Sequence, residues 1–425
     1  MQFNIYPINL LRALSMALEL STGGLSRHHW RTALISSRIA EYIGLSNAEQ
    51  QPVIYAALLH DIGAVSRWEE KQRLHYFKQD SPDIYRHAES GYQLLKDSPQ
   101  LGMLAEPIRH HHDCWDGSSP SGLAGKEIPL AGRIICLADR LEVLLRNDTF
   151  IFKQRPDILS ALRQLSGVYF DPDLVKALHE FARQESFWLD LSNSHYYQNF
   201  FYNIDVYGLM KFTINDVLNI AEIFATIIDR TSSFTATHSR SVSHISAFLA
   251  EARGYSAEEV KAMRIAGLLH DLGKLAIPNE ILEKPGKLNE WELAIIKQHT
   301  YYTYRILEQI DGFELIAEWA AYHHETLDGT GYPFRIGEKS LRLGSRIVAV
   351  ADVFVALTER RPYRDTLPMD KVEKIMREMV VNRKLDGMIA ADLFEGRHSA
   401  YSLAQQAGII KASSEIGKSV SRPPG

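Results

Sequence analysis

Apolar residues in this chain recur mainly at intervals of three and four positions, which is the period of one face of an α-helix. A clear example runs through Val217, Ile220, Ala221, Phe224, Ile227 and Ile228. Residues 263–269 form a second apolar run, which leads directly into a His-Asp pair. Alternating, strand-like stretches are few, and turn-forming clusters stand at residues 116–120 and 328–333. The pattern predicts a helical chain.

The chain also contains a second copy of its own pattern. Residues 28–63 align with residues 238–273 without a gap, and each stretch carries the run Leu-Leu-His-Asp near its end. The alignment continues with small slips to an Ala-Asp pair at Asp139 and Asp352. Such slips are what insertions in the loops of one copy would produce. Two long copies are too few for a solenoid, so they indicate duplication of a whole domain.

Length and composition agree with two globular domains. A chain of 425 residues is too long for one ordinary hydrophobic core. Its 45% hydrophobic and 23% charged residues are typical of soluble globular proteins. We predict an N-terminal domain over residues 1–205 and a C-terminal domain over residues 206–410. The polar residues 411–425 are expected to form a disordered tail.

Charge and cysteine content restrict the partners and the compartment. The formal net charge of −5 gives no electrostatic reason to expect a nucleic-acid polymer as partner. No apolar run reaches the roughly 18 residues that cross a bilayer, and the amino terminus lacks the basic start of a secretory signal. Two cysteines, Cys114 and Cys136, indicate a reducing compartment rather than a disulfide framework. We therefore expect a cytoplasmic protein without a membrane segment.

Histidine and aspartate residues stand at matching positions of the two copies. In the second copy they are His238, His270, Asp271, His299, His323, His324 and Asp352. Their counterparts in the first copy are His28, His60, Asp61, His87, His111, His112 and Asp139. Imidazoles combined with carboxylates suit divalent transition metals such as Fe, Mn, Zn or Ni better than Ca or Mg. Seven groups are too many for one ion and suit two ions that share a bridging carboxylate.

Two sequence runs in the second copy carry a resemblance to a known family. Residues 270–274 read His-Asp-Leu-Gly-Lys, and residues 323–333 read His-His-Glu-Thr-Leu-Asp-Gly-Thr-Gly-Tyr-Pro. Over approximately residues 213–395 the chain resembles the HD-GYP phosphodiesterases, and the first copy resembles a plain HD domain. The resemblance implies an all-α fold of two tandem HD-type helical bundles, each built around its candidate metal ligands.

The resemblance also implies the roles of the ligands. His238, His270, Asp271 and Asp352 would hold one metal ion. Asp271 would bridge to a second ion, and His299, His323 and His324 would complete its coordination. A hydroxide between two such cations is a usable nucleophile at neutral pH, and the cations also neutralise phosphate oxygens.

Four residues are implied in catalysis and substrate binding beside the metals. Lys274 follows the His-Asp pair and would bind a phosphate oxygen, so it is predicted to act with Asp271 in catalysis. Tyr332 would line the substrate cleft. Arg361 and Arg364 match positions that contact phosphate or guanine, for which the planar guanidinium is suited.

The implied substrate is a cyclic dinucleotide, 3'3'-cGAMP or c-di-GMP or both, hydrolysed to the linear dinucleotide. The choice between guanine and adenine depends on a few hydrogen bonds in the pocket, so both substrates stay open. A second hypothesis is a catalytically weak signalling scaffold that binds the nucleotide or a diguanylate cyclase. A third is a general nucleotide phosphohydrolase. Self-association of the chain is open.

The sequence departs from the family pattern at four positions. Phe234 stands where some members have a glutamate that binds a third metal, so we predict two metals. Thr300 replaces a usual proline, Thr303 a usual glycine and Val355 a usual aspartate. None of these changes removes a predicted ligand, but we expect the helix that we place from His299 onward to sit differently.

The first copy leaves more alternatives open. His29 could replace His28, and His110 could shift the histidine pair by one position. Cys114 is a conceivable metal contact, although a small core residue is the commoner role for such a cysteine. Ala64 stands in place of Lys274 and Asp113 in place of Glu325. Residues 118–120 replace the Gly-Tyr-Pro run. The first copy is therefore a second phosphohydrolase site, a metal-binding regulatory domain or a purely structural domain.

Overall fold

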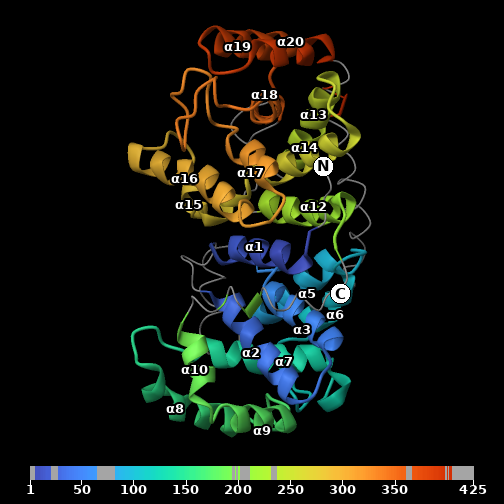
Figure 1. The fold of residues 1–425 in the computed structure, drawn as a ribbon, viewed down its shortest axis with the longest axis vertical. Helices are drawn as coiled ribbons and strands as arrows, with labels where there is room; N and C mark the ends of the chain where they lie inside the picture. The colour runs from blue at the N-terminus through green and yellow to red at the C-terminus, as the bar shows by residue number, and fades with distance from the viewer. Residues whose placement is uncertain are drawn as a thin grey trace, which may run out of the picture. The chain divides into compact units, whose positions relative to one another are not determined.

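A computed structural model gives the fold (Figure 1). It describes residues 5–20, 27–64, 82–193, 197, 200–201, 211–230, 237–359, 366–397, 400 and 402–403. Internal contacts divide the chain into two compact units, one containing Ile5–Lys211 and the other beginning at Phe212. The predicted junction at residues 205 and 206 and the predicted tail over residues 411–425 lie outside the described residues, so both remain predictions.

The N-terminal unit is helical in its described residues. Its α-helices are α1 (Pro7–Leu20), α2 (His28–Tyr42), α3 (Asn47–Leu59), α5 (Pro82–Leu95), α6 (Ala105–Arg109), α7 (Leu130–Val143), α8 (Ile151–Gln164), α9 (Pro172–Phe181) and α10 (Glu185–Ser192). Short 3-10 helices are η1 (Gly102–Leu104) and η2 (Gly125–Glu127). Helix α2 packs against both α3 and α7; His28 lies in α2, Asp139 lies in α7, and the His60–Asp61 pair directly follows α3.

The C-terminal unit repeats this plan. Its helices are α12 (Ile214–Arg230), α13 (His238–Ala252), α14 (Ala257–Leu269), η4 (Leu272–Ala276), α15 (Asn279–Leu282), α16 (Glu290–Leu307), α17 (Glu314–Ala321), α18 (Leu343–Thr358), α19 (Met369–Val381) and α20 (Gly387–Glu395). Helix α13 packs against α14 and α18, α12 packs on α14, and α16 packs against η4. The described residues contain no β-strand, and an isolated bridge joins Ser166 and Phe170. The predicted all-α fold of two tandem bundles is confirmed.

Local sequence determines where the helices that carry the His-Asp pairs begin and end. Helix α14 begins with a capping box, in which the Ser256 hydroxyl accepts from the backbone of Glu259 and the Glu259 carboxylate accepts from the backbone of Ser256. The last two residues of α14, Leu268 and Leu269, are fully buried. Their burial fixes the end of the helix in the core, and His270 follows directly as the residue that caps it.

The prediction that a helix begins at His299 is wrong. Helix α16 begins at Glu290, nine residues earlier, so that His299 lies in its second half. The reason is a capping box at Asn289, whose side chain accepts from the backbone of Glu292, while the Glu292 carboxylate accepts from the backbone of Asn289. A strong start signal therefore stands upstream of the position that the motif pattern suggested.

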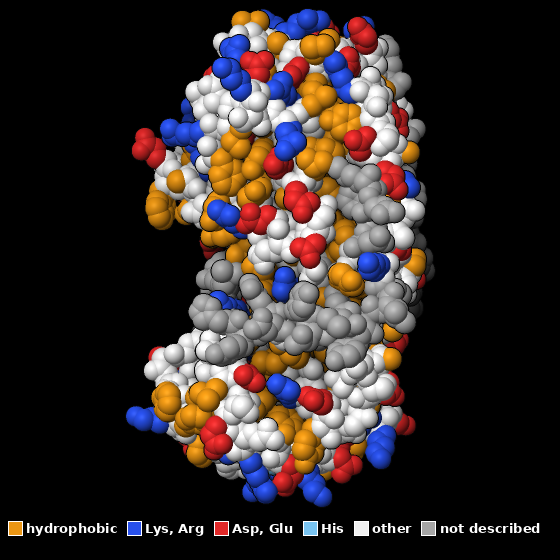
Figure 2. Space-filling model, viewed as in Figure 1, with side chains coloured by type: hydrophobic (Ala, Val, Ile, Leu, Met, Phe, Trp, Pro, Cys, Tyr) orange, Lys and Arg blue, Asp and Glu red, His pale blue; other side chains and the backbone are white. Residues whose placement is uncertain are grey.

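The surface agrees with the small net charge. On the face drawn in Figure 2, side chains of Lys and Arg are interspersed with those of Asp and Glu, and no large region of one sign is visible. Among the described helices, none is both long and apolar enough to cross a membrane.

Two glycines bring main chains into direct contact beside the His-Asp pairs. A Cβ at Gly273 would lie 2.0 Å from the backbone oxygen of His299, and a Cβ at Gly63 would lie 2.0 Å from that of His87. Neither backbone oxygen can move like a flexible side chain, so only glycine fits. The turn after each His-Asp pair is therefore in backbone contact with the helix that carries the next histidine.

We expect Gly273→Ala to lower the free energy of unfolding of the C-terminal unit by about 3 kcal/mol, the upper end of what overpacking costs. Urea denaturation followed by circular dichroism measures this. Gly337→Ala is the matched control, because a Cβ there would meet its nearest atoms at an ordinary 3.7 Å. Equal stability of the two variants would contradict the backbone contact.

Candidate metal centres

The structure brings together all seven candidate ligands of the C-terminal unit. His238 is the first residue of α13, and His270 and Asp271 follow α14. His299 comes from α16, the His323–His324 pair follows α17, and Asp352 lies in α18. The ligand atoms of His238, His270 and Asp352 lie within 4.8 Å of one another. Those of His299, His323 and His324 form a second group of the same size.

Asp271 lies between these two groups. Its Oδ2 is 3.2 Å from Nε2 of His270 and 3.8 Å from Nε2 of His238. Its Oδ1 is 3.5 Å from Nε2 of His299. One oxygen therefore faces each group, and this is the geometry in which a carboxylate can bridge two ions. Asp352 completes the first group, with Oδ1 3.2 Å from Nε2 of His238.

Hydrogen bonds on the outer side of the rings determine which nitrogen faces inward. In His270, His299 and His323, Nδ1 lies 2.8, 2.7 and 2.6 Å from the backbone oxygen of the residue three positions earlier. Because a carbonyl oxygen only accepts, Nδ1 carries the proton, and the lone pair of Nε2 points into the centre.

One of these inward nitrogens shows that the site suits a cation. Nε2 of His270 is buried and has no hydrogen-bond partner among the described residues. A buried nitrogen without a partner is costly in a protein, and a metal ion satisfies it directly. The donor set of neutral imidazoles and carboxylates therefore fits divalent transition metals.

Burial and mutual repulsion keep most of these imidazoles uncharged. Burial lowers the pKa of His299 to about 3 and the pKa of His323 well below its usual value. Burial alone would raise the pKa of Asp271, but the neighbouring His270 ring and the Lys274 ammonium hold it well below its usual range. His238 is the exception: burial lowers its pKa, but Glu359 and Asp352 raise it to about 10. The group of His299 and His323 thus combines neutral nitrogen donors with an ionised carboxylate, which is the form that binds metal.

Two predicted substrate residues lie at this centre and two lie outside the described residues. Nζ of Lys274 contacts Oδ2 of Asp271, and the ring of Tyr332 lies 4.9 Å from the ring of His324. Arg361 and Arg364 are not among the described residues, and neither is Phe234, so their roles remain predictions. Sequence reasoning missed Lys297, whose Nζ lies 5.2 Å from the centre of the Tyr332 ring. Its position two residues before His299 was the available signal.

The buried carboxylate of Glu325 holds the loop that carries Tyr332 in place. This carboxylate is 2% exposed and accepts from the backbone nitrogens of Phe334 and Ile336 at 2.6 and 2.9 Å. A Cβ at Gly331 would lie 2.5 Å from Cα of Glu325, so the chain can approach this closely only with glycine. The glycine of the Gly-Tyr-Pro run is therefore required by the close packing of this loop against the backbone that follows the His-His pair.

One departure from the family pattern has a clear structural role. Thr303, in place of a usual glycine, accepts from the backbone of Gly273 at 2.9 Å and donates to the backbone oxygen of His270 at 3.1 Å. It ties α16 to the His-Asp turn. The hydroxyl of Thr300 donates within α16, to the backbone oxygen of Lys297.

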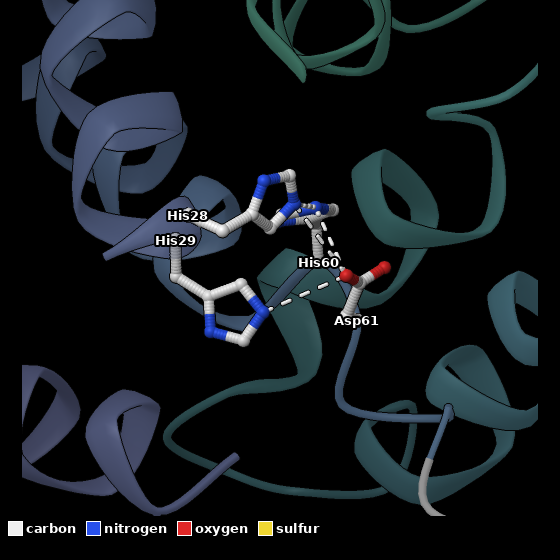
Figure 3. A group of neighbouring side chains, drawn as sticks. All are labelled: His28, His29, His60 and Asp61. Atoms are coloured by element: carbon white, nitrogen blue, oxygen red, sulfur yellow. Dashed lines mark hydrogen bonds and ion pairs between the residues drawn. The ribbon is translucent and has the colours of Figure 1, made fainter. Parts of the chain in front are cut away.

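The N-terminal unit contains a corresponding centre with one additional histidine. Figure 3 shows His28, His29, His60 and Asp61, whose ligand atoms lie within 4.8 Å of one another. Oδ2 of Asp61 is 3.6 Å from Nε2 of both His28 and His29 and 3.4 Å from Nε2 of His60. His29 therefore lies beside His28 rather than in its place.

The second half of this centre is built around the other oxygen of Asp61. Oδ1 of Asp61 lies 3.2 Å from Nε2 of His87. Nε2 of His87 is in turn 3.3 Å from that of His111 and 3.1 Å from that of His112. Asp61 thus repeats the two-sided geometry of Asp271. Asp139 also repeats the place of Asp352, with Oδ1 3.3 Å from Nε2 of His28.

Two other candidates in this unit have different contacts. His110 lies 2.6 Å from Asp113 and 3.2 Å from Glu106, outside the group around Asp61. Asp113 also accepts from Ser121 at 2.6 Å, so it does not repeat the loop contacts of Glu325. Cys114 is buried, and its backbone nitrogen donates to Ser119.

Sequence reasoning did not identify two buried carboxylates that contact residues at or beside the candidate ligands. Glu19 accepts from the backbone of His29 at 2.7 Å, and Asp229 accepts from the hydroxyl of Ser239 at 2.7 Å. Burial raises the pKa of Glu19 to about 7 and that of Asp229 to about 6. These acids occupy matching positions of the two copies, so extending the repeat alignment toward the amino terminus would have found them.

Comparison with known proteins supports this description. Models of the HD domain match residues 25–144 and residues 222–389. The chain is 31% identical over 410 residues, or 94% of both chains, to 3'3'-cGAMP-specific phosphodiesterase 1 of Vibrio cholerae. It is 44% identical over 131 residues to the cyclic di-GMP phosphodiesterase response regulator RpfG of Xanthomonas campestris, covering 30% of this chain and 35% of RpfG.

A solved structure matches along most of the chain. The crystal structure of the cyclic GMP-AMP-specific phosphodiesterase V-cGAP3 of V. cholerae superposes with a TM-score of 0.67 at 25% identity, covering 94% of this chain and 98% of V-cGAP3. Fold and His/Asp centres place the chain in the class of HD-domain phosphohydrolases, which depend on metals. Within that class, it belongs to the HD-GYP-type family of cyclic dinucleotide phosphodiesterases.

His29 and His110, the two alternative ligands of the N-terminal centre, lead to opposite expectations for metal affinity. We expect His29→Ala to weaken Mn²⁺ binding to the N-terminal unit by at least about ten-fold, because it removes a nitrogen that faces Asp61. His110→Ala should leave the affinity unchanged, because His110 faces Asp113 and Glu106. Isothermal titration of the metal-stripped chain measures both. A loss of affinity in His110→Ala alone would contradict the ligand geometry.

Proposed function

We propose that the C-terminal centre hydrolyses a cyclic dinucleotide to the linear dinucleotide with two bound divalent cations. The observation that carries this proposal is Asp271, an ionised carboxylate that offers one oxygen to each of two groups of inward-facing imidazole nitrogens. The relatives named above are phosphodiesterases of 3'3'-cGAMP or cyclic di-GMP, which supports a phosphodiester of this kind as the substrate.

Different side chains of the protein have separate roles in the proposed reaction. Two cations, when bound, would supply Lewis acidity to the phosphate and acidify a water molecule. Asp271 would offer one oxygen to each cation, and the histidines and Asp352 would complete the coordination. Fe, Mn, Zn and Ni all suit this donor set. Lys274 adds a positive charge beside Asp271, where it can donate to a phosphate oxygen of the substrate. Tyr332 lies at the edge of the centre, against His324, where it can contact the nucleotide.

We propose 3'3'-cGAMP as the main substrate and c-di-GMP as the secondary one. The relative that aligns with 94% of this chain is named for 3'3'-cGAMP, whereas the alignment with RpfG covers 30% of it. Lys297 beside Tyr332 offers a donor for base or phosphate. The scaffold hypothesis is less favoured, because a protein that only binds nucleotide has no use for seven converging metal ligands.

Asp271→Ala should lower hydrolysis of 3'3'-cGAMP by at least about 100-fold, because it removes the group shared by the two halves of the centre. Metal-reconstituted protein is incubated with each cyclic dinucleotide, and the products are identified by chromatography and mass spectrometry. Asp392→Ala, which removes a half-buried partner of Arg253 far from the candidate ligands in sequence, is the control. Equal turnover by Asp271→Ala and the unsubstituted chain would contradict the proposal, and slow turnover by both would favour the scaffold.

We infer that the N-terminal centre is a second phosphohydrolase site with a different substrate. The two-sided contacts of Asp61 support metal binding, as those of Asp271 do. Recognition of the substrate differs, since Ala64 replaces Lys274, and Asp113 binds His110 instead of a loop backbone. The linear dinucleotide product, or another nucleotide with a terminal phosphate, fits a site that lacks the Gly-Tyr-Pro loop.

Asp61→Ala should leave cleavage of the cyclic dinucleotide within about two-fold of normal while it abolishes hydrolysis of the linear product, because the two centres have separate ligands. The progress of both reactions is followed in a single time course. A variant that still consumes the linear product would limit the N-terminal centre to a regulatory or structural role.

A further inference from the structure

In each copy, the first histidine of the centre is bound on its outer side by a glutamate. Nδ1 of His28 lies 2.5 Å from Oε2 of Glu142, and Nδ1 of His238 lies 3.0 Å from Oε2 of Glu359. Both glutamates accept the Nδ1 proton and thereby direct Nε2 of the ring toward the aspartates of the centre. The two contacts are chemically the same.

The two glutamates do not occupy matching positions in the repeat. Glu142 stands three residues after the ligand Asp139, in α7. The corresponding residue, three after Asp352, is Val355, which is fully buried in α18. Glu359 stands one helical turn further on, directly after the last residue of α18. Positions three and seven residues beyond an aspartate lie on the same face of a helix, so each glutamate reaches the corresponding histidine of its own copy.

We propose that Glu359 is a positioning residue for the C-terminal metal centre and that it replaces a carboxylate lost at position 355. The need for such a residue follows from the fold. His270, His299 and His323 each donate Nδ1–H to the backbone oxygen three residues earlier. His238 is the first residue of α13 and has no earlier turn of its own helix. A side chain from another helix must therefore accept its proton.

A negative acceptor does more than orient the ring. A carboxylate bonded to Nδ1 makes Nε2 a stronger donor to a metal, and loss of such a partner typically costs 10- to 100-fold in metal affinity. Glu359 is 18% exposed, whereas Glu142 is 8% exposed and also accepts from Arg31 at 3.2 Å. Within the part of the chain that the structure describes, the relocated carboxylate thus has fewer contacts than its counterpart. This inference rests on the proposed metal centre.

The test is a titration of the metal-stripped full chain with Mn²⁺, which resolves the two centres as two classes of site. We expect Glu359→Ala to weaken one class by about 10- to 100-fold and Glu142→Ala to weaken the other. Adding Val355→Glu to Glu359→Ala should restore the lost affinity, because it places a carboxylate at the position that Glu142 holds in the first copy. At saturating Mn²⁺, Glu359→Ala should recover most of its rate, as a positioning residue requires.

Glu373→Ala is the matched control, since it removes a similarly exposed acid of the same unit that pairs with Arg377 on the surface. Unchanged Mn²⁺ affinity of Glu359→Ala would overturn the proposal even if the Val355→Glu variant does not fold. A folded double variant without restored affinity would also overturn it. An unsubstituted chain that binds no Mn²⁺ would instead remove the proposed function itself, so the two failures are distinguishable.

Discussion

The structure depends on one electrostatic arrangement, an ionised aspartate surrounded by imidazoles, several of which direct Nδ1 outward to a carbonyl or carboxylate oxygen. Burying a carboxylate among unprotonated nitrogens is costly unless a cation completes the group. Each copy meets this constraint through main-chain carbonyls that accept the outer protons of histidines. Helix α13 begins at His238 and α14 ends directly before His270, because helix ends and the turns beside them expose the carbonyls and the space that these rings require.

Much of the fold and the ligand set followed from sequence, because both rest on local signals. Apolar spacing identified helices such as α12 and α14, and the repeated Leu-Leu-His-Asp run marked where buried helices end. The start of α16 was missed because the motif centred on His299 drew attention away from the cap at Asn289. Glu359 was missed for a different reason: its partner is 121 residues away, and it does not occupy the position that the repeat predicts.

The two copies show which parts of the design tolerate change. The aspartate and its imidazoles are retained in both, whereas the residues that would recognise a substrate differ. Glu325 holds a loop backbone in one copy, and the shorter Asp113 bonds to a histidine and a serine in the other. A carboxylate side chain that is one methylene group shorter is therefore accompanied by different contacts beside a similar set of candidate ligands. Metal chemistry and substrate choice can diverge separately in such a duplicated chain.

The absence of a side chain at Gly273 affects how far the surrounding sequence can change without altering the geometry of the site. Since the turn beside Asp271 and the helix of His299 meet through their main chains, the spacing between the two halves of the centre is a property of backbone contact. Apolar residues elsewhere in each bundle are then free to exchange for others of similar volume without moving the reactive groups. Because glycine carries a hydrogen atom in place of a methyl group, the distance between this turn and the helix of His299 stays constant even when most residues around it change.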